Sequence, residues 1–255
     1  QTSEDSKIYV TSKNNLVDSL TGGVLIAENK GAHLYSDQDV GGKVLNIIGG
    51  PNSVSGDITK SENIENRFHG ETRYETAVEI AHELGTDRDI ILCSGENFAD
   101  ALPATSLAAK DDMNILLVTG YNIPEPTKEY LQKYSQDKNI IIIGGEDSVS
   151  AELEKEVSSI TNASNIRRIY GENRFETSKS IANEFEYNTG LVLADGNVKD
   201  ITLLSSILAS KNEYPLILVN ESSEVKLDEY TNERINDLLV LTNKNTKITD
   251  QGEAN

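Results

Sequence analysis

The chain repeats itself, and this internal repetition constrains its fold more than any other feature of the sequence. The segment HGETRYETAVEIA, at 69–81, nearly recurs as YGENRFETSKSIA at 170–182. Three longer runs begin at Lys7, Asp89 and Gly190, and each contains an apolar segment, a polar loop, an aspartate that opens a helical pattern, and a second apolar segment. The three aspartates are Asp18, Asp100 and Asp200. Repetition on this scale predicts several small modules rather than one undivided domain.

A second pattern follows the first two runs. The segments NIIGGPNSVSGDI, at 46–58, and IIIIGGEDSVSAEL, at 140–153, share an apolar strand, a Gly-Gly pair and a Ser-Val-Ser that leads into a helical pattern. The segment LLVLTNKNTKITD, at 238–250, is a third copy without the Gly-Gly pair. Strands separated by helical crossovers predict parallel pairing, and near-continuous apolar strands are typical of strands buried on both faces. We therefore predict an α/β fold with mainly parallel sheets and flanking helices.

The repeats divide the chain into three tandem modules. We predict a partial first module at 1–62, a second module at 63–160 and a third at 161–255. The first module lacks the Gly-x-x-Arg segment. It also has only QDVGGK, at 38–43, where the second module has a long segment with a helical pattern, so we expect one crossover helix fewer in the first module.

Composition excludes some classes of partner. The formal net charge of −19 repels the phosphate backbone that a nucleic-acid-binding protein must neutralise, and it disfavours adsorption to anionic membranes. No apolar run approaches the roughly 20 residues that a membrane span needs. Cys93 is the one cysteine, and its apolar neighbours predict a core residue rather than a catalytic thiol. No signal peptide is visible at Gln1, so the chain is either intracellular or has lost its signal.

Each Gly-x-x-Arg segment places an arginine, Arg73 or Arg174, in the first turn of a predicted helix. The helix dipole makes a cation unfavourable there, so a compensating interaction is expected. One interpretation is an ion pair with the aspartate that opens the next helix, Asp100 or Asp200, which would clamp neighbouring strand–helix units together. The other is a pocket in which the arginine and backbone N–H groups bind an acidic group of a ligand. Sequence alone leaves both open.

Local signals around these segments favour structural roles. Thr72 and Asn173 each precede a glutamate by three residues, which is the spacing of a helix N-cap. The Gly-Gly pairs match no phosphate-binding motif, and we interpret them as tight strand exits that lead to a serine N-cap. The three histidines do not have the spacing of metal ligands, and surface or turn roles are expected for them. They are His33, His69 and His82.

Acidic residues near strand ends suggest an alternative function, a metal-dependent nucleotide or phosphoester enzyme. The candidates are Glu96, Asp100, Glu146 and Asp147. The corresponding positions of the third module include Asn197 and the asparagines of 243–245, so the acidic set does not persist. An enzyme gathers unlike residues in one cleft, whereas this chain repeats one modest set. Repetition therefore favours binding, without a catalytic residue or a cofactor.

Four segments of the second module, in this order, resemble the cell-wall-binding type 2 repeat (CWB2) of surface proteins from clostridia and related Gram-positive bacteria. They are HGETRYETAVEIA (69–81), SGENFADALPATSLAA (94–109), NILLVTG (114–120) and IIIIGGEDSVS (140–150). The likeness covers almost the whole chain; it is close in the second module, good in the third and partial in the first. The resemblance implies three modules packed as a pseudo-threefold trimer, with an incomplete first module. It implies a noncatalytic anchor that holds a secreted surface protein noncovalently to an anionic cell-wall polysaccharide. Other S-layer proteins are a further class of partner, and a docking array in an S-layer is a further alternative.

The resemblance also implies an anchoring motif, Ile-Leu-Leu in the family, which lies in an apolar segment of the second module (115–117) and of the third (216–218). In the first module only Leu34 matches it, between His33 and Tyr35. Because the motif lies in strands, we expect it to act through folding rather than by touching a sugar. The structural and anchoring set is Asp18, Asp100, Asp200, Ile115, Leu116, Leu117, Leu216, Ile217 and Leu218.

A chain of charge −19 must hold an anionic polymer through local groups, because physiological salt screens charges beyond about 8 Å. Arginines in grooves between modules, helped by loop asparagines, would supply these groups; a bridging divalent cation is the other route. The polysaccharide-binding candidates are Arg67, Arg73, Asn97, Arg167, Arg168, Arg174 and Asn197. Several weak sites on one polymer raise the overall affinity by roughly 10² to 10⁴.

Overall fold

The computed structural model describes residues 7–38, 43–54, 63–97, 101–185, 190–221, 223–227, 230, 237–242 and 247–249. Asp100 and the asparagines of 243–245 lie outside the described residues. None of the helices in the described part of the chain is long and apolar enough to span a bilayer.

The first module forms a four-stranded sheet with strand order β2-β1-β3-β4. Its elements are β1 (Ile8–Thr11), α1 (Val17–Glu28), β2 (Ala32–Tyr35), β3 (Leu45–Ile48) and β4 (Ile64–Phe68). All neighbouring strands in it are parallel. Asp18 lies in the first turn of α1, as the sequence predicts.

The second module has the same strand order, β6-β5-β7-β8, again with parallel pairs. Its elements are α2 (Arg73–Leu84), β5 (Ile90–Ser94), α3 (Ala104–Lys110), β6 (Asn114–Val118), α4 (Glu125–Tyr134), β7 (Asn139–Ile143), α5 (Ala151–Ile160) and β8 (Asn165–Ile169). The crossover helix predicted for this module is α4, and the helix predicted after Ser-Val-Ser is α5.

The third module has a three-stranded sheet with order β10-β9-β12 and a separate parallel pair, β11 and β13. Its elements are α6 (Arg174–Ala182), β9 (Gly190–Asp195), α7 (Lys199–Asn212), β10 (Leu216–Val219), β11 (Glu224–Lys226), β12 (Asp237–Leu241) and β13 (Lys247–Thr249). The predicted α/β fold with parallel sheets is confirmed.

The sheets are not divided at the predicted module boundaries. β4 follows residue 62 but pairs with β3 of the first sheet, and β8 follows residue 160 but pairs with β7 of the second sheet. The helix that follows each of these strands packs on the next sheet: α2 lies on β6 of the second sheet, and α6 lies on β10 of the third. Each Gly-x-x-Arg turn therefore carries the chain from one sheet to the next module.

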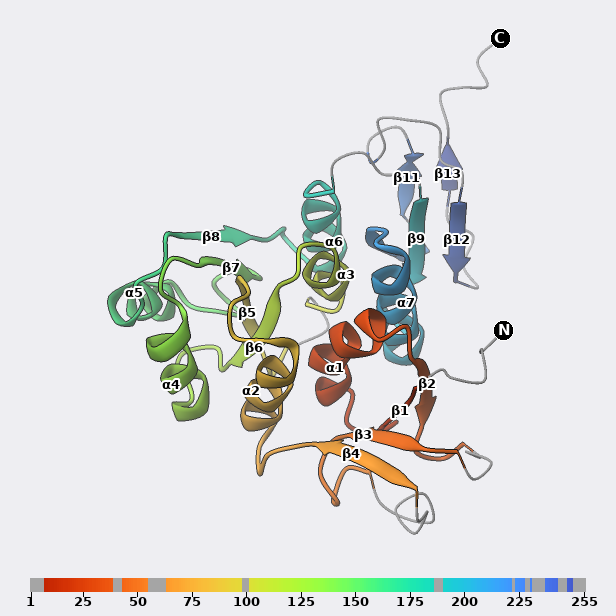
Figure 1. Cartoon of the computed structure of the whole chain (residues 1–255). Helices are drawn as coiled ribbons and strands as arrows, with labels where there is room; N and C mark the ends of the chain where they lie inside the picture. Colours follow the sequence, from red (N-terminus) through yellow and green to blue (C-terminus); the bar gives the residue numbers. More distant parts are fainter. Residues whose placement is uncertain are drawn as a thin grey trace.

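Three helices meet at the centre of the molecule, one from each module. Figure 1 shows α1, α3 and α7 side by side, with the three sheets arranged around them. Their apolar side chains, among them Leu20, Val24, Leu107 and Leu203, belong to one buried cluster. At Gly23 of α1 an added Cβ would stand 2.7 Å from the Thr105 methyl group of α3, so the helices approach as closely as the missing side chain allows. The three modules thus share one core.

The second sheet is buried on both faces, as its apolar strands predict. Along β5, Ile91 and Cys93 face the central cluster, whereas Ile90 and Leu92 join the cluster on the side of α4 and α5. This alternation follows from the two-residue period of a strand. Burial raises the pKa of the Cys93 thiol to about 12, which fits the predicted core residue.

The amino-terminal ends of the sheets hold further contacts between modules. Arg88 donates to both carboxylate oxygens of Glu28 at the end of α1. Lys110 lies 5.4 Å from the centre of the Phe185 ring, and Lys211 donates to the Gly31 carbonyl at 3.0 Å. The contacts differ chemically, but each joins the end of a central helix to a neighbouring module.

The close contact between α1 and α3 predicts that Gly23→Ala changes the free energy of unfolding in opposite directions, depending on the residue at position 105. Gly23→Ala gains about 1 kcal/mol of helix propensity but overpacks the contact at a cost of about 1–3 kcal/mol, so we expect a lower free energy of unfolding. Thr105→Ser removes the opposing methyl group. In that background Gly23→Ala should raise the free energy of unfolding by about 1 kcal/mol, as measured by urea denaturation. The same loss in both backgrounds would contradict the close contact.

His33 predicts a pH dependence of stability. Its Nε2 lies 2.8 Å from Thr11 Oγ1, its ring meets Tyr35, and burial lowers its pKa from 6.5 to about 4. Between these values the unfolded chain binds a proton that the folded chain excludes, so His33 lowers stability as pH falls from 6.5 to 4. His33→Gln should reduce the slope of unfolding free energy against pH by up to about 1.4 kcal/mol per pH unit in this window. An unchanged slope would contradict the lowered pKa.

Candidate functional site

A pocket of about 540 Å³ opens where the first sheet meets α2. Its walls come from the loop after β1, the Gly-Gly turn after β3, and the turn that leads into α2. We call it the junction pocket, because both the first and the second module line it. The pocket lies beyond the carboxyl ends of parallel strands, where open α/β sheets bind their ligands.

The turn that leads into α2 is fixed by its own hydrogen bonds. Thr72 caps the helix: its Oγ1 accepts from the Glu75 N–H at 3.3 Å, and Glu75 accepts from the Thr72 N–H at 2.8 Å. At Gly70 a Cβ would stand 2.0 Å from that of Glu75, so only glycine fits. Asn173 caps α6 by accepting from two backbone N–H groups. Both predicted N-caps are confirmed.

The arginines that open α2 and α6 both hold a loop of the module that follows. Arg73 donates to the Gly95 carbonyl beyond β5, and Arg174 donates to the Gly196 carbonyl beyond β9 at 3.3 Å. The clamp interpretation is thus supported with a backbone carbonyl as the partner of each arginine. Of the partners predicted for the clamp, Asp100 lies outside the described residues. Arg174 contacts the loop after β9 through its hydrogen bond to Gly196, and a pairing with Asp200 stays a prediction.

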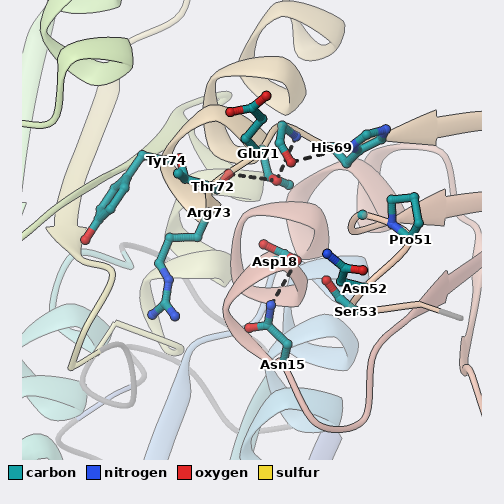
Figure 2. Close-up of a pocket in the computed structure, with 13 residues that line it drawn as sticks. Asn15, Asp18, Pro51, Asn52, Ser53, His69, Glu71, Thr72, Arg73 and Tyr74 are labelled. Atoms are coloured by element: carbon teal, nitrogen blue, oxygen red, sulfur yellow. Dashed lines mark hydrogen bonds between the residues drawn. The ribbon is translucent and has the colours of Figure 1, made fainter.

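Asp18 lies at the centre of the junction pocket. Figure 2 shows it between Arg73 on one side and the loop of residues 51–53 on the other, with Asn15 Nδ2 donating to its Oδ2 at 3.3 Å. The side chain is 4% exposed, and within the described part of the chain its Oδ1 has no hydrogen-bond partner. Burial raises the pKa of Asp18, while the nearby Arg73 and His69 and a hydrogen bond with the Ser53 side chain oppose the rise.

Arg67 and Arg168 hold the Gly-Gly turns. Arg67 donates to the Gly49 carbonyl at 2.8 Å, and Arg168 donates to the Gly144 carbonyl at 2.7 Å. Both glycines have positive φ, +119° and +109°, a region that side chains disfavour. The predicted tight strand exit is therefore confirmed at both turns. The predicted serine N-cap is confirmed in the second module, where Ser150 accepts from the Leu153 N–H at 3.2 Å.

Arg167 and Arg168 are neighbours on β8 but contact different elements. Arg168 also pairs with Glu154 of α5 at 2.7 Å, and its side chain is 11% exposed. Arg167 pairs with Glu184, beyond α6, at 2.7 Å, and its side chain is 41% exposed. Adjacent residues of a strand point to opposite faces, so these two predicted binding residues cannot line one groove.

The loop asparagines occupy equivalent positions. Asn97 and Asn197 are exposed; Asn97 Nδ2 donates to Ser148 Oγ at 3.4 Å, and the Asn197 N–H donates to Asp195 at 3.0 Å. Sequence reasoning missed Asn15, which lies in the junction pocket. The signal was present, because each of these asparagines precedes an aspartate of the set Asp18, Asp100 and Asp200 by three residues.

The anchoring motif lies below the loops that the arginines hold. Ile115, Leu116 and Leu117 are buried in β6, and Leu216, Ile217 and Leu218 are buried in β10, as the sequence predicts. A Cβ at Gly95 would stand 3.4 Å from Leu117, and one at Gly196 would stand 3.1 Å from Leu218. The last residue of each motif thus supports a loop that accepts an arginine hydrogen bond. That its role is structural stays a prediction.

Acidic residues of the described segments do not gather into a group. No three His, Cys, Asp or Glu side chains there lie close enough to hold one metal ion. Asp100 is outside this comparison.

Two comparisons with known sequences point to one family. The model of Cell wall binding domain 2 (CWB2) matches residues 67–154 and 168–251, well over half of the chain. In Bacillus subtilis (strain 168), the amidase enhancer is 30% identical over 203 residues, which are 76% of this chain and 28% of that protein. N-acetylmuramoyl-L-alanine amidase LytC is 30% identical over 164 residues, 64% of this chain and 32% of that protein. The chain thus spans about a third or less of these relatives.

Solved structures share the fold. Cwp8 from Clostridium difficile matches 93% of this chain and 45% of its own with a TM-score of 0.76 at 22% identity. Cwp6 from the same organism matches 86% of this chain and 38% of its own with a TM-score of 0.75, also at 22% identity. At this identity the likeness concerns the fold alone, and it confirms the predicted arrangement of α/β modules.

The contacts of the two β8 arginines predict unequal effects on stability. Arg168→Ala leaves two backbone carbonyls and Glu154 without their donor, and we expect a loss of about 2–4 kcal/mol in the free energy of unfolding. Arg167→Ala removes one half-exposed ion pair and should cost less than about 1 kcal/mol. Chemical denaturation of the two variants measures both values. Equal losses would contradict the structural role of Arg168.

Proposed function

Because the chain belongs to the Cell wall binding domain 2 family, we propose that it anchors a surface protein noncovalently to the cell wall by binding an anionic polysaccharide. The observation that carries the proposal is the junction pocket, which two modules build together. Its Gly-x-x-Arg turn recurs at the second junction, where Arg174 and Asn173 repeat the contacts of Arg73 and Thr72. Recurrence of one modest site suits a polymer of repeating units.

Local positive charge at the two crossings between modules allows a chain of net charge −19 to bind an anionic polymer. Arg73 and His69 line the junction pocket, and salt screens the distant acidic residues. Arg167 and Arg168 are paired with glutamates, so they contribute less positive charge for binding the polymer. Arg73 and Arg174 are the arginines that we assign to the polymer.

Several weak sites give the anchor its strength. A polymer that occupies two junctions at once binds the second at a high effective concentration, which raises overall affinity by roughly 10² to 10⁴. No bond is made or broken in this function, so the proposal assigns the region no catalytic residue. In this proposal the protein acts outside the cell, at the wall, with other S-layer proteins as neighbours.

The arginines at the two junctions predict a cooperative loss of wall binding. Arg73→Ala and Arg174→Ala should each reduce cosedimentation with purified Gram-positive cell walls, and the double variant should lose far more than either. Arg167→Ala is the matched control, because it removes the same charge from an arginine that is paired with Glu184. Acid extraction of the wall polysaccharide should abolish binding of the wild type. A folded double variant that still sediments with walls would show that the arginines are clamps only.

A further inference from the structure

We propose that the junction pocket recognises a sugar unit through Asp18, which accepts a hydrogen bond from a hydroxyl or ammonium group of that sugar. The inference rests on the proposed function and makes its ligand more specific: Asp18 contacts a sugar group of the wall polymer, whereas Arg73 is assigned to its anionic group. Four observations lead to it.

The first observation is the unpaired oxygen of Asp18. Asp18 is 4% exposed, and its Oδ1 has no hydrogen-bond partner among the described residues. A buried polar atom without a partner costs free energy, and native structures rarely keep one without a reason. Because Asp18 lines the pocket, a ligand bound there can supply the missing donor.

The second observation is the set of side chains around Asp18, which favours its role as a hydrogen-bond acceptor. Arg73 and His69 lie near enough to favour its charged form, which opposes the effect of burial on its pKa. In its ionised form Asp18 only accepts hydrogen bonds, so a ligand of that form must donate. Asn15 holds the other oxygen in place by donating to Oδ2, which leaves Oδ1 as the atom for the ligand.

The third observation is the balance of charge in the pocket. Asp18 and Glu71 line it together with Arg73 and His69, and one N–H of Arg73 is already directed to Gly95. A phosphate or carboxylate placed against Asp18 would face a buried carboxylate, where charge is screened poorly. A hydroxyl group suffers no such repulsion, and an ammonium group is attracted.

The fourth observation is the size and polarity of the pocket. Its volume of about 540 Å³ lies within the usual range for small-ligand sites, roughly 300–1,000 Å³, and is enough for one or two sugar rings. Asn15, Asn52 and Ser53 line it with groups that both donate and accept. Such groups match hydroxyls, which also do both.

The first experiment compares Asp18→Asn with Glu28→Gln in cosedimentation with purified cell walls. Both variants neutralise one acidic residue of α1, but Glu28 lies at the other end of the helix and pairs with Arg88. We expect Asp18→Asn to bind walls about tenfold more weakly, the value of one hydrogen bond to a charged group. Glu28→Gln should bind as the wild type does. A folded Asp18→Asn protein with wild-type retention would overturn the inference.

The second experiment uses small probes and does not depend on wall binding. N-acetylglucosamine, glucosamine and inorganic phosphate are titrated into the wild type and Asp18→Asn, and chemical shifts of pocket amides are followed by NMR. The expected result is binding of a sugar by the wild type and its loss in Asp18→Asn. Binding of both sugars identifies a hydroxyl donor, and binding of glucosamine alone identifies an ammonium donor. Binding of phosphate alone, or of no probe, would contradict the inference.

The two experiments separate the inference from the proposed function. If the wild type fails to sediment with walls, the anchor function fails, and the sugar titrations still decide on Asp18. If the wild type sediments and Asp18→Asn sediments equally well, the anchor function stands and the inference fails.

Discussion

The structure depends on one constraint, the crossing of the chain from one sheet to the next at each Gly-x-x-Arg turn. The backbone of β4 is hydrogen-bonded to β3 in the first sheet, while α2 buries Ala77 and Ile80 against the second module. The turn between them is short and permits no other residue at Gly70. A strand and a helix that are adjacent in sequence are therefore committed to different modules, and the same arrangement recurs at β8 and α6.

This crossing also explains why packing and binding meet in the same residues. The turn that joins two modules forms one wall of the junction pocket, and its Arg73 reaches both the loop of Gly95 and the neighbourhood of Asp18. A residue in this place can stabilise the assembly and contact a ligand at once. The clamp and the ligand pocket, which the sequence presents as alternatives, are compatible in the structure.

Local features were predictable from the sequence, and pairings between distant segments were not. The N-caps at Thr72 and Asn173 follow from spacing within a few residues, and parallel strands follow from helical crossovers. The sheet to which β4 belongs depends on a partner strand that no local pattern names. The hydrogen bond from Arg174 to Gly196 was missed because a backbone carbonyl leaves no signature in sequence. Asn15 has the same spacing to Asp18, but the first module has no Gly-x-x-Arg segment to mark it as part of a site.

The shared centre of the molecule has a consequence for how it denatures. Since α1, α3 and α7 bury their side chains against one another, no module keeps a complete core when its neighbours come apart. We therefore expect the chain to unfold in one cooperative transition, rather than module by module. The proposed wall binding would then be lost in one transition on heating, rather than one junction at a time.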